Sequence, residues 1–350
     1  NILTGMMSHL KETHEKVLSG IEAFKLNDTF GFPLDLTREI AAEAGFAVDE
    51  AAFHIEMTKQ RERARAERLA KDISGWSADL FGELTAETTR YETLSEKAKV
   101  LALSDGEELV DAIATDEAGE VKDGVLVVLN HTPFYAEMGG QVADHGYLVS
   151  GDAKLKVTKV KKTPKGYFVH TCELLDGTIH VDDEVTASVD EKRRAAICRN
   201  HTATHLLQKA LREVLGEHVH QAGSYQDDHI THFDFTHFSA VSPAELAEVE
   251  RRVNEKIYEA LPVTVQNLPI EEAKKMGAMA LFGEKYGEIV RVCNVSGKSV
   301  ELCGGTHISN TARIGLFKIV SESSVAAGVR RIEAATGTNV LDIIHQDEAL

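Results

Sequence analysis

The sequence has few cysteines, no long apolar run and no excess of basic residues, and each of these deficits excludes a class of protein. Four cysteines in 350 residues do not make a disulfide framework, so each thiol is expected to lie in a core or to bind a metal. The longest apolar stretches, such as 125–129 and 315–320, are far shorter than the roughly 20 residues of a spanning helix, and the start is unlike a signal peptide. We therefore expect a soluble, cytoplasmic protein with no membrane partner.

The charge balance is acidic, because 56 acidic side chains stand against 38 basic ones and give a formal net charge of −18. This charge argues against a DNA partner and against non-specific RNA binding, although a local basic patch can still meet a specific RNA. The length suffices for two or three domains with their own cores. The chain opens with Asn1 and stops inside the helical pattern of 340–350, so we expect a piece of a longer protein.

The residue pattern predicts an α+β multidomain protein with three regions. Residues 1–90 form an N-terminal helical segment, because apolar side chains recur at helical spacing from Leu10 through Val17, and Asp35 and Asp49 can each cap a helix. The other two regions are a β-rich one at 91–190 and a mixed one at 191–350.

Residues 91–190 predict a small β-barrel. Short β-type runs are separated by turn residues such as Asp105-Gly106 and Asp176-Gly177, and such even spacing of strands is typical of a barrel. The expected strands are 99–104, 124–130, 146–149, 154–161, 167–172 and 184–189.

Residues 191–350 predict a mixed α/β domain. A helix at 191–215 ends at Gly216, and the capping box of Ser242 and Glu245 opens a second helix that runs to 260. The expected strands are 230–235, 263–268, 289–295, 300–302 and 316–321.

One hairpin concentrates positive charge in this acidic chain. Two interpretations remain open: an edge strand that lysines protect from aggregation, or a contact to an RNA backbone. The lysines are Lys154, Lys156, Lys159, Lys161, Lys162 and Lys165.

Two pairs of residues have the spacing of metal ligands. His201 and His205 lie four residues apart in a predicted helix, which places both imidazoles on one face. Cys303 and His307 share a glycine-rich turn after a predicted strand, and Cys with His is a preferred ligand pair for Zn²⁺. Together the four residues predict a His₃Cys zinc site.

The role of such a metal stays open at this point. Four protein ligands fill a zinc tetrahedron and are typical of a structural site, whereas a catalytic zinc keeps one position for water or substrate. Cys172, Cys198 and Cys293 stand in apolar contexts without a spaced partner, so we expect them to be core thiols.

Two further segments offer groups for an acyl-transfer site. Gly139 and Gly140 present backbone N–H groups to a carbonyl or oxyanion, and Thr132 nearby presents a hydroxyl, unless the segment is an ordinary β-turn. Gln221 is a candidate for holding substrate or water, with a plain loop between helix and strand as the alternative.

Several motifs resemble the alanyl-tRNA synthetase family, nearly from end to end of the chain. The similarity is to the end of the tRNA-recognition region and the editing domain of the bacterial type. The motifs are Asp28-Thr-Phe-Gly-Phe-Pro within 23–36, Thr132-Pro-Phe-Tyr-Ala-Glu-Met-Gly-Gly-Gln, Asn200-His-Thr-Ala-Thr-His-Leu-Leu, Glu301-Leu-Cys-Gly-Gly-Thr-His, 277–287 and 326–337.

The resemblance implies that the region 191–350 is a zinc-containing editing domain. It implies that the His₃Cys set binds zinc, that Gln221 takes part in editing, that Thr132 and the turn at Gly139 and Gly140 line the pocket, and that Asp28 lies where the acceptor stem is read. Three positions depart from the family pattern as we expect it: Asn27, Met138 and His232.

The implied reaction is hydrolysis of Ser-tRNA(Ala) and Gly-tRNA(Ala). A pocket shaped for alanine cannot strongly reject glycine or serine, since such differences are worth only about 1–3 kcal/mol, so a second site must clear the errors. The implied partners are tRNA(Ala) carrying Ser or Gly and the remaining domains of the parent synthetase, which ligates alanine to tRNA(Ala) with ATP through a core that we do not find in this chain.

Two alternatives remain. One is a freestanding trans-editing deacylase with a similar barrel and zinc domain, and the other is an RNA-binding module whose zinc is purely structural. A metalloprotease is excluded, because the helix reads His-Thr-Ala-Thr-His from His201 and lacks the glutamate that serves such enzymes as general base.

Overall fold

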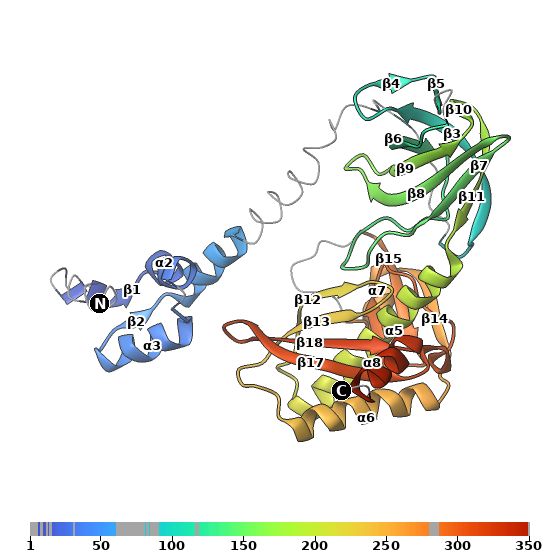
Figure 1. Ribbon diagram of the computed structural model, residues 1–350. Coiled ribbons are helices and arrows are strands. Elements are labelled where there is room, and N and C mark those ends of the chain that lie inside the picture. The colour runs from blue at the N-terminus through green and yellow to red at the C-terminus, as the bar shows by residue number, and fades with distance from the viewer. Residues whose placement is uncertain are drawn as a thin grey trace. The chain divides into compact units, whose positions relative to one another are not determined.

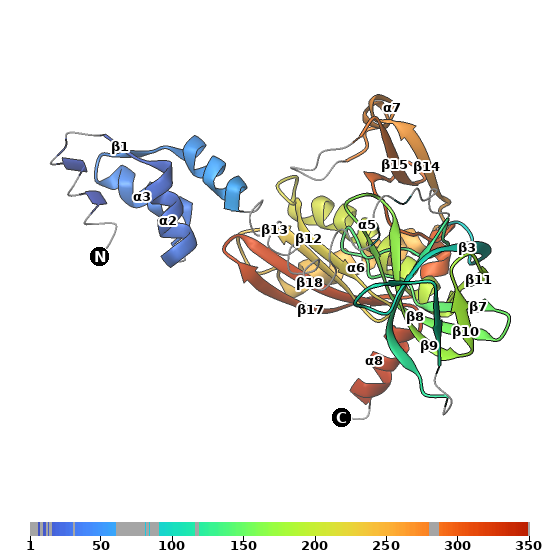
Figure 2. The same cartoon turned by 90° about the horizontal axis from the view of Figure 1, so that it is seen from above.

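The chain forms two compact units, Asn1–Ala78 and Asp79–Leu350 (Figures 1 and 2). The predicted domain boundaries at residues 90 and 190 stay predictions. The computed structural model describes residues 6, 7, 10, 11, 13, 16–30, 32–60, 81, 84, 91–115, 119–279 and 287–348.

The first unit contains α2 (Gly20–Phe30), α3 (Leu34–Glu43) and a helix at 50–60, together with a parallel pair formed by β1 (Val17–Leu18) and β2 (Ala47–Val48). The prediction of helix through Val17 is wrong, because Val17 and Leu18 pair with β2 and the fully buried Leu18 joins the core of this unit.

The two predicted helix caps in this unit have different outcomes. Asp49 caps the helix at 50–60 as predicted, with its Oδ1 accepting from Ala52 N at 3.0 Å. Asp35 does not cap α3, because that helix already begins at Leu34 with Pro33 as the N-cap. Asp35 lies instead in the first turn, where its charge is favourable to the helix dipole.

The second unit begins with a closed six-stranded antiparallel barrel, as predicted. Closure follows from the pairing of the first strand with the last, β3 with β11. The strands in order around the barrel are β3 (Ser95–Ser104), β6 (Lys122–Leu129), β9 (Phe168–Asp176), β8 (Ala153–Lys162), β7 (Gly146–Ser150) and β11 (Glu184–Val189). The short strands around it are β4 (Leu109–Val110), β5 (Ala112–Ala114) and β10 (Thr178–His180).

Side chains along each strand alternate between inward and outward, and the inward ones fill the barrel. In β8 the inward residues Leu155, Val157 and Val160 are fully buried, and the lysines between them point outward. The strand is paired with β7 on one side and β9 on the other. β7 pairs with β8 only from Ala153 to Val157, so Lys154 and Lys156 lie where the strand has two neighbours, and the interpretation as a protected edge strand stays a prediction for the part beyond Val157.

The rest of the unit is built on α5 (Glu191–Leu215) and α6 (Pro243–Tyr258), which begin and end close to the predicted residues. The capping box is present, since Ser242 Oγ accepts from Glu245 N and the Glu245 carboxylate accepts from Ser242 N. The two helices lie side by side and pack on a four-stranded sheet (Figures 1 and 2). The order of this sheet is β12 (Gln221–Gln226), β13 (Thr231–Thr236), β18 (Val329–Thr336) and β17 (Phe317–Ala326).

A second small sheet has the order β14 (Val263–Pro269), β15 (Ile289–Val295) and β16 (Ser299–Leu302). The remaining described elements are α7 (Ile270–Lys275), a 3₁₀ turn (Thr311–Ile314) and α8 (Thr338–Glu348). The motif at 277–287 lies partly outside the described residues. Within the described part of the chain, no helix is long and apolar enough to cross a membrane.

A buried ion pair joins the barrel to the start of α5. Arg194 Nε donates to Asp144 at 2.9 Å, and the guanidinium also donates to the carbonyls of Tyr91 and Pro133, each at 2.9 Å. Asp144 additionally accepts from the N–H of Tyr135 at 2.7 Å. Because both charges are buried and fully hydrogen-bonded, they fix the orientation in which α5 leaves the barrel.

Candidate metal centre

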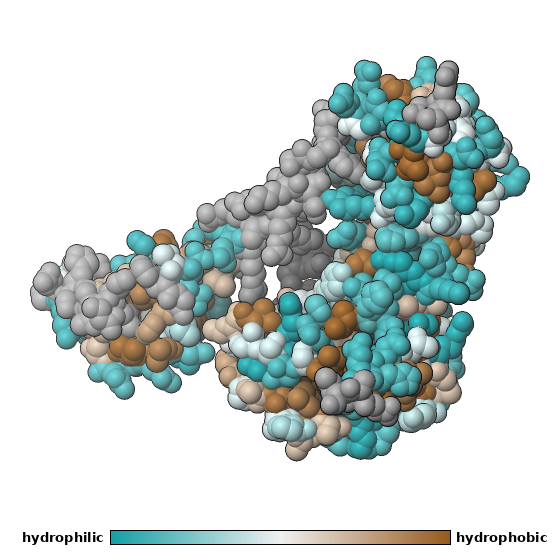
Figure 3. Space-filling view, in the orientation of Figure 1, coloured by the Kyte–Doolittle hydropathy of each residue, from teal (hydrophilic) through white to brown (hydrophobic). Residues whose placement is uncertain are grey.

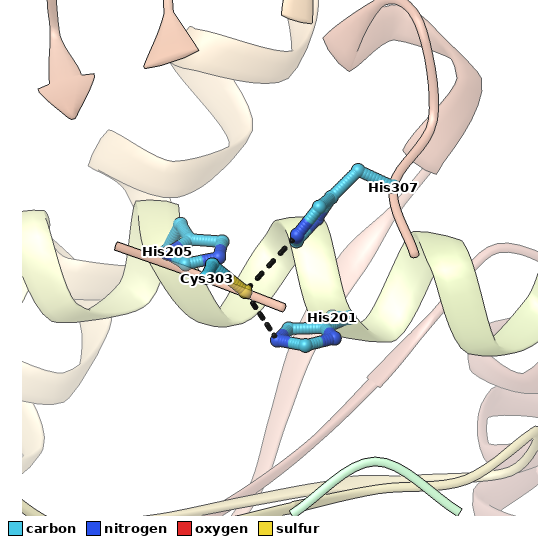
Figure 4. A group of neighbouring side chains, drawn as sticks. All are labelled: His201, His205, Cys303 and His307. Atoms are coloured by element: carbon cyan, nitrogen blue, oxygen red, sulfur yellow. Dashed lines mark hydrogen bonds between the residues drawn. The ribbon is translucent and has the colours of Figure 1, made fainter. Parts of the chain in front are cut away.

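The structure brings the four predicted ligands together. His201 and His205 project from one face of α5, while Cys303 and His307 come from the turn that follows β16 (Figure 4). Cys303 Sγ lies 3.3 Å from His201 Nε2 and 3.2 Å from His307 Nε2. One ligand atom from each of the four residues lies within 4.8 Å of the others.

The first two imidazoles of the cluster are oriented by hydrogen bonds at their other nitrogen. Nδ1 of His201 lies 2.7 Å from Gln141 Oε1, and Nδ1 of His205 lies 2.7 Å from the Glu301 carboxylate. Because each oxygen accepts from Nδ1–H, these contacts leave Nε2 as the nitrogen that can bind a metal once the ring is neutral.

The third imidazole is held in the same way. His307 Nδ1 lies 3.2 Å from Thr202 Oγ1, which also accepts from Ile308 N at 3.3 Å. Nε2 of His205 is buried and has no hydrogen-bond partner among the described residues. An unpartnered buried nitrogen aimed at a thiol and two other imidazoles fits a metal ligand.

The electrostatics of the cluster favour a bound cation. Burial raises the pKa of the Cys303 thiol, but the three imidazoles outweigh burial and place the pKa well below its ordinary value. Burial lowers the pKa of His307 to about 3, so this imidazole is neutral. Burial also lowers the pKa of His205, and the Glu301 carboxylate reverses this and holds it well above the usual range. The metal-free cluster therefore holds a thiolate beside a protonated His205. Loss of that proton on metal binding would give zinc a thiolate and imidazole nitrogens as donors, with a carboxylate behind His205.

The glycine-rich turn is required by close packing. A Cβ on Gly305 would overlap the ring of His201 and the side chain of Gln141. Arg291 holds the same turn by donating to the carbonyls of Gly305 and Cys303, the latter at 3.3 Å. Only glycine therefore lets the turn approach α5 closely enough for Cys303 to reach the two helical histidines.

Sequence reasoning missed Gln141, which connects the barrel to this centre. Its fully buried side chain accepts from His201 Nδ1 and from Thr306 N, and it donates to Thr306 Oγ1 at 2.9 Å. Gly140 before it has φ +88°, and its carbonyl accepts from Gln226 N at 2.9 Å, which docks the turn on β12. The signal was present in the sequence, because Gln141 closes the quoted Gly-Gly-Gln motif.

Thr132 lies in the barrel and is almost fully buried. His170 Nδ1 donates to the carbonyl of Val127, so Nε2 of this neutral ring is the acceptor, and the Thr132 hydroxyl donates to it at 2.8 Å. The hydroxyl also accepts from Phe134 N at 3.2 Å. No hydrogen bond joins Thr132 to the four clustered residues within the described part of the chain.

Gly139 and Gly140 both have positive φ, at +61° and +88°. Within the described residues, their N–H groups donate to no protein acceptor. Gln221 opens β12, where its amide donates to Ser224 Oγ at 3.3 Å. The segment is therefore a strand with a bulge after Gln221 and not the plain loop that was the alternative.

The remaining predicted site residue, Asp28, is exposed on α2 and accepts a hydrogen bond from the Gln60 amide. Of the three departures from the family pattern, Asn27 donates to the Phe32 carbonyl at 3.5 Å, Met138 packs against the barrel core, and His232 lies 3.3 Å from Glu333 on the neighbouring strand.

The other three cysteines are free and buried, as expected of core thiols. Burial raises the pKa of Cys293 to about 12 and raises that of Cys172 further. Cys198 is more than a packing residue, because its Sγ lies 3.2 Å from the Oγ1 of Thr306, which Gln141 also contacts.

Comparison with known proteins gives matches to two family models and to several relatives. A family model described as tRNA synthetases class II (A) matches residues 1–193, and one described as threonyl and alanyl tRNA synthetase second additional domain matches residues 290–333. Alanine–tRNA ligases of Bacillus mycoides (strain KBAB4) and of Acetivibrio thermocellus are each 47% identical to the chain over its whole length. The chain spans 39% of the length of each of these relatives.

Proposed function

The chain belongs to the class II alanyl-tRNA synthetase family. We propose that its second unit is an editing domain that hydrolyses Ser-tRNA(Ala) and Gly-tRNA(Ala). The reaction would take place at the cluster of His201, His205, Cys303 and His307. The observation that carries the proposal is the convergence of these four ligand atoms, with each imidazole oriented by its own partner. Ligation of alanine to tRNA(Ala) with ATP would be the activity of the whole synthetase.

The four clustered residues would hold zinc, with their partners Gln141, Glu301 and Thr202 fixing the ring orientations. A zinc ion bound there would supply Lewis acidity toward the ester or toward water. With four protein ligands the site is nearly closed, so we propose that the metal centre chiefly orients the ester, while the chain's own polar groups serve the reaction.

The turn at Gly139 and Gly140 would stabilise the oxyanion of the tetrahedral intermediate. Its two N–H groups have no protein acceptor among the described residues, and Gln141, next in the chain, contacts His201. The amide of Gln221 would position the attacking water. We find no Ser-His-Asp arrangement in the quoted motifs, so we propose direct attack by water without a covalent intermediate.

Thr132 would read the serine hydroxyl. Its hydroxyl donates to His170 and accepts from Phe134 N, which leaves one lone pair to accept a hydrogen bond from the substrate. Serine satisfies that lone pair, whereas alanine would leave it unpaired beside an apolar methyl group. Glycine also lacks a hydroxyl, and it would enter because its missing methyl group leaves room for a water molecule at that lone pair.

The test is release of serine from Ser-tRNA(Ala) by the purified chain, with Ala-tRNA(Ala) as substrate control and the Cys303→Ala variant as protein control. We expect hydrolysis of the seryl and glycyl esters only, and loss of both in the variant together with its zinc. Retention of full activity by a metal-free variant would contradict the proposal.

One specific observation favours a second candidate, an RNA-binding module with structural zinc. All four ligands are protein side chains, which is the usual composition of a structural site. In that case the chain would bind zinc and tRNA(Ala) and release no amino acid. A freestanding deacylase is disfavoured, because the class II family match covers the first unit and Asp28, which we propose meets the acceptor stem.

A further inference from the structure

The outer face of β8 carries a continuous row of ammonium groups. We call Lys154, Lys156, Lys159 and Lys161 the lysine ridge; they alternate with the buried inward residues of the same strand. At roughly 3.3 Å per residue the row is about 23 Å long. In Figure 3 the barrel, at the upper right, presents a mostly hydrophilic surface.

The charges of the ridge are only partly compensated. Lys156 pairs with Glu173 at 3.0 Å, and the ammonium of Lys154 lies 5.0 Å from the centre of the Tyr147 ring. Lys159 is exposed and has no ion-pair partner among the described residues. With no carboxylate paired to Lys159, this part of the strand presents a positive charge that can attract a polyanion locally, although the chain has a net charge of −18.

A second lysine pair on the same barrel provides a contrast. Lys97 and Lys99 lie on β3, three strands away from β8 in either direction around the barrel. Lys97 pairs with Glu184 and Lys99 with Asp182, each at 2.7 Å. These two ammonium groups are neutralised by the protein, whereas Lys159 on β8 has no ion-pair partner among the described residues.

The ridge leads to the candidate metal centre. β7 pairs with β8 only as far as Val157, and beyond that point the carbonyl of Val160 accepts from Glu137 N at 3.0 Å. Glu137 belongs to the turn that continues through Gly140 to Gln141, whose side chain contacts His201. Lys159 and Lys161 therefore flank the residue at which β8 meets the proposed oxyanion turn.

We infer that the lysine ridge binds the phosphates of the single-stranded 3′ end of the tRNA substrate and guides its terminal ester to the metal centre. The inference rests on the proposed function, because it takes the 3′ end as the reacting end. A flexible polyanion several phosphates long matches a row of ammonium groups, and its last nucleotide would lie over the turn at Gly139 and Gly140.

The test compares the double variant Lys159→Ala/Lys161→Ala with the control Lys97→Ala/Lys99→Ala, which also removes two positive charges. Affinity for uncharged tRNA(Ala) is measured over a range of salt concentrations. We expect the ridge variant to lower affinity about tenfold at low salt and to reduce the slope of log K against log salt by about 1.4, that is, about 0.7 for each lost contact. The control should change neither quantity appreciably.

A tRNA(Ala) trimmed of its last four nucleotides locates the contact. The ridge substitutions should have no effect on its binding, because the segment that meets the ridge is gone. Equal weakening with trimmed and intact tRNA, or equal behaviour of the ridge and control variants, would overturn the inference. Thermal unfolding and zinc content of both variants should match the unsubstituted chain, which excludes a folding defect.

The deacylation assay separates this inference from the proposed function. If the unsubstituted chain hydrolyses Ser-tRNA(Ala), the ridge variant should raise KM and leave kcat unchanged; unchanged KM would overturn the ridge alone. If the chain shows the ridge-dependent binding and no hydrolysis, the proposed function fails while the contact between the ridge and the 3′ end stands.

Discussion

The buried histidines of the barrel interior and of the candidate metal centre differ in how their ring nitrogens are hydrogen-bonded. In the barrel, His170 is completely buried and both ring nitrogens are hydrogen-bonded, to Val127 and to Thr132. In the centre, each imidazole has one nitrogen bonded to an orienting partner and turns the other toward a common point with Cys303. The difference separates a buried polar group that serves the core from a set that is incomplete without a ligand.

The sharpest test of this comparison is to remove one imidazole from each region. His205→Leu should lower zinc affinity by at least 100-fold, because it deletes one of four ligands, whereas His170→Leu should leave it unchanged. Competition with a chromogenic chelator measures both values. A large loss of zinc affinity in His170→Leu would show that the barrel and the centre do not act separately.

Acid should destabilise the barrel through His170. Burial lowers the pKa of His170 to about 4, below the ordinary value of 6.5, so between these values the unfolded chain binds a proton that the folded chain does not. Stability therefore falls as the pH drops from about 6.5 to about 4, by roughly 3 kcal/mol at 1.36 kcal/mol per pKa unit.

Urea unfolding of the unsubstituted chain and of His170→Leu between pH 7 and pH 4 measures this contribution. The difference between the two should shrink by roughly that amount on acidification, because the variant has no imidazole to protonate at this position. A difference that is constant with pH would mean that the pKa of His170 is the same in the folded and the unfolded chain.

Two fully buried glutamines, Gln141 and Gln226, make a matched pair. Gln141→Leu should weaken zinc binding about 10- to 100-fold, since it removes the acceptor that orients His201. Gln226, equally buried, has no side-chain hydrogen bond within the described structure, so Gln226→Leu should leave zinc affinity unchanged. Similar zinc affinities for the two variants would refute the positioning role of Gln141.

Local signals predicted the helices of the second unit well. α5 begins after Asp190 and ends before Gly216, as expected. Both hydrogen bonds of the Ser242 capping box are formed. These features depend on neighbours in the sequence. The helical spacing of His201 and His205 is local in the same sense, which is why the centre could be predicted in part.

The errors arise where distant segments decide the structure. β8 was open to interpretation as an edge strand because the sequence does not show how far β7 pairs with it, which is only up to Val157. β12 and β18 were not predicted as strands, and the sheet that holds them joins the hairpin β12–β13 to the hairpin β17–β18 much later in the chain. Gln141 was overlooked as a partner of His201 for the same reason, because the contact spans 60 residues.

The smallest expected effect concerns Thr132. Its hydrogen bonds are made to residues of the barrel, whereas its proposed role is to read the serine hydroxyl in the editing site. Thr132→Val removes the hydrogen bond to His170 and should cost about 1 kcal/mol of stability, with zinc affinity unchanged. Hydrolysis of Ser-tRNA(Ala) should fall relative to that of Gly-tRNA(Ala), because only serine offers a hydroxyl to the lost lone pair. Equal reductions for both substrates would assign Thr132 to the barrel alone, and the comparison between the two regions would then have no residue in common.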